Sequence, residues 1–484
     1  MKKLASLAVV LVAVFAMCGS VWAFNAAEHL SVAPNGKGDV LIFPQYIAMP
    51  GGWQTKLTVI NTCDSMSVVA KVVVRSGGWT KELLDFFIFL SPTDVWTGTL
   101  DYAGSNVRLY STDDSIIKDE AGNFATPTDP FNVNLQSVCA GDLPLTGVPG
   151  NQLGYVTVVE TWNYDGTWNW VRNGVTTTVD FSQPPVQKAA IRDVFNWYNS
   201  SNPNVSSIPF AGDVNEVANV LAGSYEISNF SLGWYAANDA TVIQNANVFD
   251  WTKVKLAQET RLGDSTFRND YCEFEAALAK NRVAMHYYSA NNSYGNVTVH
   301  FNTFPTKYTL VSNCQIVAPG VKSEFFLDNG LNQVGGSVSD MHQYIRYGLI
   351  WYDLSENTTT TSGFVSPVRP EDSYHFPYEL NLTEKIWSIT YTEGWANYEY
   401  DYNTACTAAD TVTAVEFTGA PVIPVTMYYN LAGMALHGAA WNDGYVEVGG
   451  AMDYLYKYNW RAYDGVNTIP NFCEAVPATL PVTF

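Results

Sequence analysis

An alternating pattern at 154–181 constrains the fold of this chain more than any other feature of its sequence. Here GYVTVVETWNY, TWNWVR and VTTTVDF are separated by the dipeptides Asp165-Gly166 and Asn173-Gly174. Alternation of apolar and polar residues is typical of a half-buried β-strand. Asp-Gly and Asn-Gly favour the positive φ angles of type I′ turns, which join hairpin strands. The pattern therefore predicts a three-stranded antiparallel meander.

Strand-like runs continue toward the N-terminus. Between residues 39 and 100, four short runs rich in Val, Ile and Phe (DVLIFPQYIA, KLTVINTC, SVVAKVVVRS and LLDFFIFL) are broken by GG, SGG and SPTD. Short β-branched and aromatic runs bounded by turn residues are typical of sandwich strands. We therefore expect a mainly β protein with β-sandwich, immunoglobulin-like domains.

Helical spacing of apolar residues is confined to the middle third of the chain. It occurs at 185–198, at 217–223 after the capping-box pair Asp213 and Glu216, and at 267–278. Capping boxes and apolar residues three or four positions apart indicate amphipathic helices. We expect a few short helices there, with packing faces rather than ligand-binding ones.

The first 23 residues have the parts of a secretory signal peptide. Lys2 and Lys3 precede an apolar run from Leu4 to Met17, and the segment ends in small residues at Ala23. This apolar run is too short to span a bilayer. Export is therefore expected. The alternative, a lipoprotein site at Cys18, is disfavoured because Met17 is too large for that processing.

These patterns divide the chain into three parts. We expect a signal peptide at 1–23, an N-terminal β-sandwich domain at 24–320 and a C-terminal β-rich domain at 321–484. The N-terminal domain would contain a helix-bearing insertion at about 182–290.

Six cysteines remain after the signal peptide, and none forms a CxxC pair. In an oxidising compartment an even number of such cysteines favours disulfides over zinc binding or redox catalysis. Buried free thiols are the alternative. Because domains usually fold as units, we expect pairing within each third of the chain. The expected disulfides are Cys63–Cys139, Cys272–Cys314 and Cys406–Cys473.

The chain is acidic, with 25 Lys and Arg against 46 Asp and Glu and a net charge of −21. This balance argues against nucleic acid as a partner, since phosphate recognition needs a basic surface. The densest acidic run contains Asp113, Asp114, Asp119 and Glu120. Carboxylates of this kind are calcium ligands, so the run is our candidate metal site. A solvated surface loop is the alternative.

Short catalytic motifs are missing from the sequence. It contains no HExxH, GxSxG, GxxxxGK or GxGxxG, and its six histidines are scattered without ligand spacing. We therefore name no catalytic residue and no cofactor other than Ca²⁺. Glycosidases need only two carboxylates brought together in space, so an enzyme is not excluded on this ground.

Two segments are candidate ligand faces. Trp168 and Trp170 alternate onto one side of an expected strand, where indoles can stack on sugars or on a partner protein. In TEGWANYEYDYN, Glu399 and Asp401 share one face of an expected strand with Glu393. Carboxylates two residues apart on a strand are separated by about 7 Å, a spacing that suits a shared Ca²⁺ or a glycosidase pair. Simple packing of the tryptophans and a solvated polar face are the alternatives.

Five short segments stand out by their sequence: FNTFPTKYTL at 301–310, LIWYDLSENTTTTSGFVSP at 349–367, FPYELNLT at 376–383, VINT and FIFLSPTDVW. These segments resemble uncharacterised, surface-layer-like secreted proteins of Gram-negative bacteria. The resemblance implies an envelope location at the cell surface and no activity.

A different architecture is suggested by the C-terminus, where Val476, Ala478, Leu480, Val482 and Phe484 alternate up to a terminal Phe. This resembles the last strand of an outer-membrane β-barrel. Two prolines within the segment disfavour it, because each would remove a backbone donor from the strand.

Together these observations predict a secreted, non-enzymatic structural protein of the cell envelope. It would act by display or lateral assembly, with itself or other cell-surface components as partners. The first alternative is a secreted carbohydrate-binding or carbohydrate-active protein, and the second is an outer-membrane β-barrel.

Overall fold

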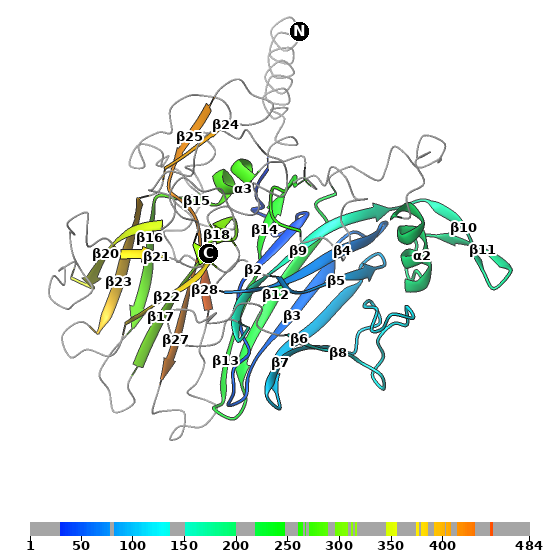
Figure 1. Ribbon diagram of the computed structural model, residues 1–484, viewed down its shortest axis with the longest axis horizontal. Coiled ribbons are helices and arrows are strands. Elements are labelled where there is room, and N and C mark those ends of the chain that lie inside the picture. Colours follow the sequence, from blue (N-terminus) through cyan, green and yellow to red (C-terminus); the bar gives the residue numbers. More distant parts are fainter. Residues whose placement is uncertain are drawn as a thin grey trace, which may run out of the picture.

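The computed structural model describes residues 30–77, 82–135, 151–199, 218–246, 260–264, 267, 271–288, 296–307, 311–312, 315–316, 345–355, 374–376, 379–385, 392–401, 403–407, 414–430 and 446–448. Within them the chain is mainly β and antiparallel, with short helices, as the sequence predicts (Figure 1). The expected signal peptide and the alternating C-terminal segment lie outside the described residues.

Two six-stranded antiparallel sheets, which we call the first sheet pair, form the larger part of the described chain (Figure 1). One contains, in spatial order, β1 (Ser31–Val32), β14 (Thr241–Gln244), β2 (Val40–Ile47), β9 (Leu153–Tyr164), β4 (Ser67–Ser76) and β5 (Glu82–Leu90). The other contains β13 (Trp234–Asp239), β12 (Leu221–Asn229), β3 (Trp53–Asn61), β6 (Val95–Ala103), β7 (Asn106–Ser111) and β8 (Phe131–Leu135).

Buried side chains of both sheets belong to one hydrophobic cluster. Phe43 of β2 meets Tyr225 of β12 edge to face, with ring centroids 6.2 Å apart. Phe86 of β5 packs against Trp96 of β6 at 5.5 Å. Each large apolar side chain buried in this way contributes about 1.5–3 kcal/mol to folding. The first sheet pair is therefore held together mainly by apolar area.

The helix expected at 217–223 is wrong for residues 218–223, which the structure describes. Leu221 is the first residue of strand β12, which is hydrogen-bonded to β3 on one side and β13 on the other. Gly223 lies inside this strand rather than at a helix end, and a Cβ there would come within 2.8 Å of the Phe43 ring. Burial of Gly223, Tyr225 and Ile227 at every second position shows the strand period, which the capping-box pattern obscured.

The expected meander is correct at one turn and wrong at the other. β10 (Thr167–Arg172) and β11 (Val175–Asp180) form a hairpin, and Asn173 and Gly174 have φ angles of 52° and 76°. β10 does not pair with β9, however, and the hairpin is a separate two-stranded sheet. In the sheet, β9 instead lies between β4, which pairs with it from Gly154 to Tyr164, and β2, which pairs with it from Leu153 to Val159.

Two helices cover the outer face of the sheet that contains β4. They are α2 (Lys188–Asn199) and α3 (Tyr271–Leu278), which confirm the helices predicted at 185–198 and 267–278. Phe195 of α2 packs on Phe87 and Phe89 of β5, with ring centroids 4.9 and 6.2 Å away. No helix in the described part of the chain is long and apolar enough to cross a lipid bilayer.

Two four-stranded antiparallel sheets form what we call the second sheet pair. The outer sheet contains β16 (Arg282–Tyr288), β23 (Glu393–Asp401), β20 (Ile345–Asp353) and β21 (Tyr374–Phe376). The inner sheet contains β22 (Leu380–Lys385), β17 (Asn296–Thr303), β27 (Ile423–Asn430) and β28 (Val446–Val448). Short ladders join β15 (Ala279–Lys280) to β26 (Ala420–Pro421), β18 (Val311–Ser312) to β19 (Gln315–Ile316), and β24 (Asn403–Thr407) to β25 (Ala414–Thr418).

The inner sheet lies between two cores. Val299 and Phe301 of β17 belong to the hydrophobic cluster of the first sheet pair. His300, the residue between them, instead contacts Tyr398 and Trp351 of the outer sheet. Side chains that alternate along β17 thus face opposite layers, and this sheet is buried on both faces.

Strand pairing crosses the domain boundary expected at 320. β16 and β17, which precede residue 320, pair with β22, β23 and β27, which follow it. Thr303 of β17 also donates a hydrogen bond to the carbonyl oxygen of Pro44 at 2.6 Å. The boundary stays a prediction, but the described strands on its two sides share sheets.

Candidate functional site

The segment TEGWANYEYDYN, a candidate ligand face, forms strand β23 of the outer sheet, and every second side chain of this strand is at least partly exposed. In β23, Glu393, Trp395, Asn397 and Glu399 are half-buried or exposed, and the residues between them are buried. The alternation predicted for TEGWANYEYDYN is therefore confirmed. Asp401 also belongs to β23, paired with Arg346, but its side chain lies outside the described set.

Cross-strand pairing places three ring-bearing residues in one row on this face. His286 of β16 and Tyr352 of β20 lie directly opposite Trp395 on its two sides. The rings of Tyr352 and Trp395 are stacked, with an interplanar angle of 12° and centroids 5.2 Å apart. Sequence reasoning missed His286 and Tyr352 as partners of Trp395. The alternation of residues along a strand shows which side chains share a face, but it does not show which residues of neighbouring strands lie opposite each other.

Hydrogen-bonding groups surround this aromatic row. His286 Nδ1 lies 2.7 Å from the hydroxyl of Tyr428, and Nε2 lies 3.4 Å from Glu393 Oε1. Arg282 and Glu399 form an ion pair across β16 and β23. These four side chains on the sheet face (His286, Glu393, Arg282 and Glu399) are 36–48% exposed. The face therefore offers hydrogen-bond donors and acceptors, and the charges of Arg282 and Glu399 are already paired.

A buried polar network lies directly beneath the face. His300 is fully buried, with Nδ1 2.8 Å from the Tyr398 hydroxyl and Nε2 3.0 Å from the carbonyl oxygen of His286. Burial lowers the pKa of His300 to about 4, so its ring is neutral at pH 7. Nε2–H then donates to the carbonyl, and Nδ1 accepts from Tyr398. The Tyr398 hydroxyl also contacts Thr383 of β22, which ties the outer sheet to the inner one.

The two tryptophans of the predicted ligand face pack toward α2. Trp170 is 7% exposed, and its Nε1 donates a hydrogen bond to Asp193 Oδ2 at 2.9 Å. Trp168 is partly buried against the same hydrophobic cluster, which also contains Val194 and Phe195. Packing accounts for the position of both indoles in this structure.

The acidic run predicted to bind calcium forms a turn and a loop. Asp113 Oδ1 accepts from the backbone N–H of Ser115 at 2.9 Å. Burial, followed by the charge of Asp113, raises the pKa of Asp114. Asp119 accepts from the side chain and backbone of Asn123, and these bonds lower its pKa.

These hydrogen bonds occupy oxygens that a metal would need. Glu120 is exposed, like Asp114 and Asp119. Among the residues that the structure describes, no three His, Cys, Asp or Glu side chains gather to hold a metal ion. A calcium ion at this run would therefore need ligands from outside the described residues or from a neighbouring molecule.

The expected disulfides fall largely outside the described side chains. Cys63 carries a thiol 3.7 Å from Ser65 Oγ, and it has no disulfide partner within the described residues. Its expected partner, Cys139, lies outside them, as do Cys314 and Cys473. Cys272 and Cys406 lie in α3 and β24, with side chains that are not described. The three pairings stay predictions.

A buried acid pair joins distant segments of the first sheet pair. Asp39 is 3% exposed and accepts the backbone N–H groups of Asn219 at 2.6 Å and Ala246 at 3.1 Å. Glu160 is also buried and accepts from Asn163 Nδ2 at 2.7 Å. Burial raises the pKa of Asp39 to about 6, and burial together with the charge of Asp39 raises the pKa of Glu160 well above its usual value. Sequence reasoning missed this pair because its members are brought together only by the β2–β9 pairing.

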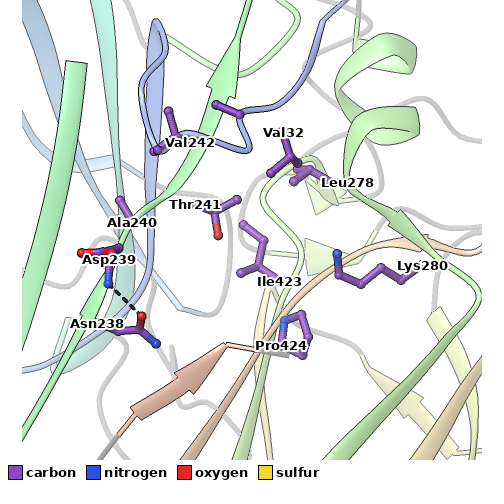
Figure 2. Close-up of a pocket in the computed structure, with 12 residues that line it drawn as sticks. Val32, Asn238, Asp239, Ala240, Thr241, Val242, Leu278, Lys280, Ile423 and Pro424 are labelled. Atoms are coloured by element: carbon purple, nitrogen blue, oxygen red, sulfur yellow. Dashed lines mark hydrogen bonds between the residues drawn. The ribbon is translucent and has the colours of Figure 1, made fainter. Parts of the chain in front are cut away.

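A small cavity lies where the two sheet pairs and α3 meet (Figure 2). It has a volume of about 180 Å³. The side chain of Lys280 extends into it from β15, opposite Asp239 of β13 (Figure 2). Its apolar wall includes Val32, Val242, Leu278, Ile423 and Pro424. Ligand and cofactor sites usually have volumes of roughly 300–1,000 Å³, so this cavity is suited to a few water-sized molecules.

Comparisons of the chain with protein-family models, with curated proteins and with solved structures find no match in any of the three. The resemblance to secreted surface proteins therefore stays a prediction. Function has to be inferred from the contacts of this chain alone.

Proposed function

We propose that this chain is a secreted, non-enzymatic structural protein of the bacterial cell envelope, which acts by display and lateral assembly. In this proposal the first sheet pair is an immunoglobulin-like β-sandwich domain that serves as a rigid body. Its partners are other copies of the chain or other cell-surface components. Support for the proposal comes from the hairpin β10–β11.

This hairpin is the observation that carries the proposal. It forms a sheet of its own and projects from the body of the molecule beside α2 (Figure 1). Nearly every residue of β11 is exposed, and Val171 and Val175, near the turn, are 63% and 64% exposed. Trp170 anchors the hairpin through its bond to Asp193. An anchored hairpin with apolar exposed positions and open edges is suited to pairing with a strand of another molecule.

Charge is the main obstacle to assembly. A net charge of −21 makes identical copies repel one another at long range. We expect Ca²⁺ shared between carboxylates of neighbouring copies to offset this repulsion. Exposed Asp114 and Glu120 are the candidate ligands in this run, and Asp119 would join them only by exchanging its hydrogen bonds to Asn123.

Sedimentation velocity of the purified protein, with and without Ca²⁺, tests the proposal. We expect concentration-dependent association that calcium strengthens and chelation reverses. Val175→Asp should abolish it, whereas Val95→Asp, at an exposed valine of β6, adds the same charge elsewhere and should weaken association only slightly. A protein that stays monomeric under all these conditions, or a Val175→Asp variant that associates as well as Val95→Asp, would contradict lateral assembly through the hairpin.

A further inference from the structure

The outward face of β16, β23 and β20 has the features of a binding surface. Its central row consists of His286, Trp395 and Tyr352, one residue from each strand. Neighbouring strands lie about 4.8 Å apart, so the row is roughly 10 Å long. Tyr428 of β27 reaches the His286 end of the row, and the side chains of all three row residues stay partly exposed among the residues that the structure describes. We infer that this face binds a neutral polysaccharide.

The aromatic pair provides the apolar part of such a site. Trp395 and Tyr352 are both half-buried, and their rings are nearly parallel. Both side chains are attached to neighbouring strands and stack on each other, so they lose little conformational entropy when a ligand binds. The apolar C–H face of a pyranose ring can pack on the exposed side of this stack.

The charges on the face favour a neutral ligand over a charged one. Arg282 is paired with Glu399, and His286 is hydrogen-bonded to Glu393. Arg282 and Glu399 cancel, and Glu393 adds one carboxylate beside His286, so the set offers a polyanion no excess positive charge and a polycation at most one excess carboxylate. Each of these groups can still exchange a hydrogen bond with a hydroxyl. Asn397, in the next row of β23, adds an amide that both donates and accepts.

The layer beneath makes the face rigid. His300 accepts from Tyr398 of β23 and donates to the carbonyl oxygen of His286 of β16. Its ring also stacks on Trp351 of β20, with centroids 5.5 Å apart. One buried side chain thus contacts all three strands of the face. A preorganised face avoids part of the ordering cost of binding.

Affinity electrophoresis in gels that contain β-1,4-glucan, β-1,3-glucan or mannan tests this inference, with alginate as the anionic comparison. We expect at least one neutral polysaccharide to retard the protein. Trp395→Ala and Tyr352→Ala should each weaken binding at least tenfold. Trp395→Phe should retain part of the affinity. The matched control is Tyr235→Ala, at a 46% exposed tyrosine of β13, and it should bind like the unmodified chain.

Two further measurements keep the result interpretable. Far-ultraviolet circular dichroism should be the same for Tyr352→Ala and the unmodified chain, and the variant should keep a cooperative melting transition, which separates loss of binding from loss of fold. Binding by the Val175→Asp variant separates the polysaccharide site from assembly through the hairpin. Retardation by alginate alone, no retardation by any polysaccharide, or full binding by folded Trp395→Ala and Tyr352→Ala would overturn the inference.

Discussion

Between the sheets of the first pair, Phe43 packs on Tyr225 and Phe86 packs on Trp96 within one hydrophobic cluster. Between the sheets of the second pair, by contrast, His300 forms hydrogen bonds that join the two layers. Apolar contact depends on buried area and shape but has no required direction. Buried hydrogen bonds require direction, and an unmatched partner costs free energy. We therefore expect the two sheet pairs to respond differently to the same chemical change.

The largest effect should come from removing a large ring from the first core. Trp96 is fully buried, and Trp96→Ala should lower the free energy of unfolding by about 3–5 kcal/mol, because it removes apolar area and leaves a cavity. Val95→Ala, at the exposed neighbouring position, should change it by less than about 0.5 kcal/mol. Urea unfolding followed by circular dichroism measures both. Equal effects at the two positions would mean that the described core does not determine stability.

Acid should act on the second sheet pair through His300. Its pKa falls from 6.5 in the unfolded chain to about 4 in the folded one. The stability that this neutral ring contributes is complete above pH 6.5 and is lost as the pH falls toward 4, by about 3 kcal/mol in total. A His300→Gln variant should show a flatter pH profile over this range. The test is urea unfolding at pH 4–7, and an unchanged slope in the variant would rule out His300 as the source.

Removing one buried tyrosine hydroxyl from each sheet pair compares the stability of the two cores most directly. Tyr398 donates to His300, so Tyr398→Phe should destabilise by about 1–3 kcal/mol because it leaves a buried acceptor unpaired. The hydroxyl of Tyr225 has no hydrogen-bond partner within the described residues. Tyr225→Phe should therefore be neutral or slightly stabilising. Thermal melting of the two variants side by side measures this difference, and equal losses would remove the proposed distinction between the cores.

Base should act on the first sheet pair, in the opposite direction, through its acid pair. The pKa of Glu160 is raised in the folded chain by burial and by Asp39. Stability is therefore complete below the usual pKa of 4.5 and decreases as the pH rises through the raised value, by at most about 1.4 kcal/mol per pH unit. Glu160→Gln should reduce this decrease and be more stable than the unmodified chain at pH 8. A variant whose stability falls as steeply as that of the unmodified chain above pH 4.5 would contradict the assignment.

Local patterns predicted much of the fold because they act over a few residues. The Asn173-Gly174 turn, the helices α2 and α3, and the alternation of β23 all follow from periods or turn preferences within one segment. The pattern before Leu221 misled because a capping box can precede residues that a sheet recruits as a strand. Tertiary pairing outweighed local propensity there.

The candidate site could be predicted only in part for the same reason. Trp395 and its outward neighbours follow from alternation, but Tyr352 and His286 lie beside Trp395 through the register of three strands that are distant in sequence. Likewise, Trp168 and Trp170 alternate as expected, yet only the position of α2 determines what they contact. Strand register and the placement of covering helices depend on the whole chain, and a single sequence leaves them open.

The inner sheet of the second pair has a consequence for how the molecule can come apart. Phe301 and Val299 contribute to one core and His300 to another from successive positions of the same strand. Pulling the outer sheet away would strip one face of β17, and separating the first sheet pair would strip the other. Neither step leaves a fully covered fragment. We therefore expect the described strands to unfold as one cooperative unit, so that a cut in a surface loop would leave the fragments associated and a pulling force would be resisted by both cores together.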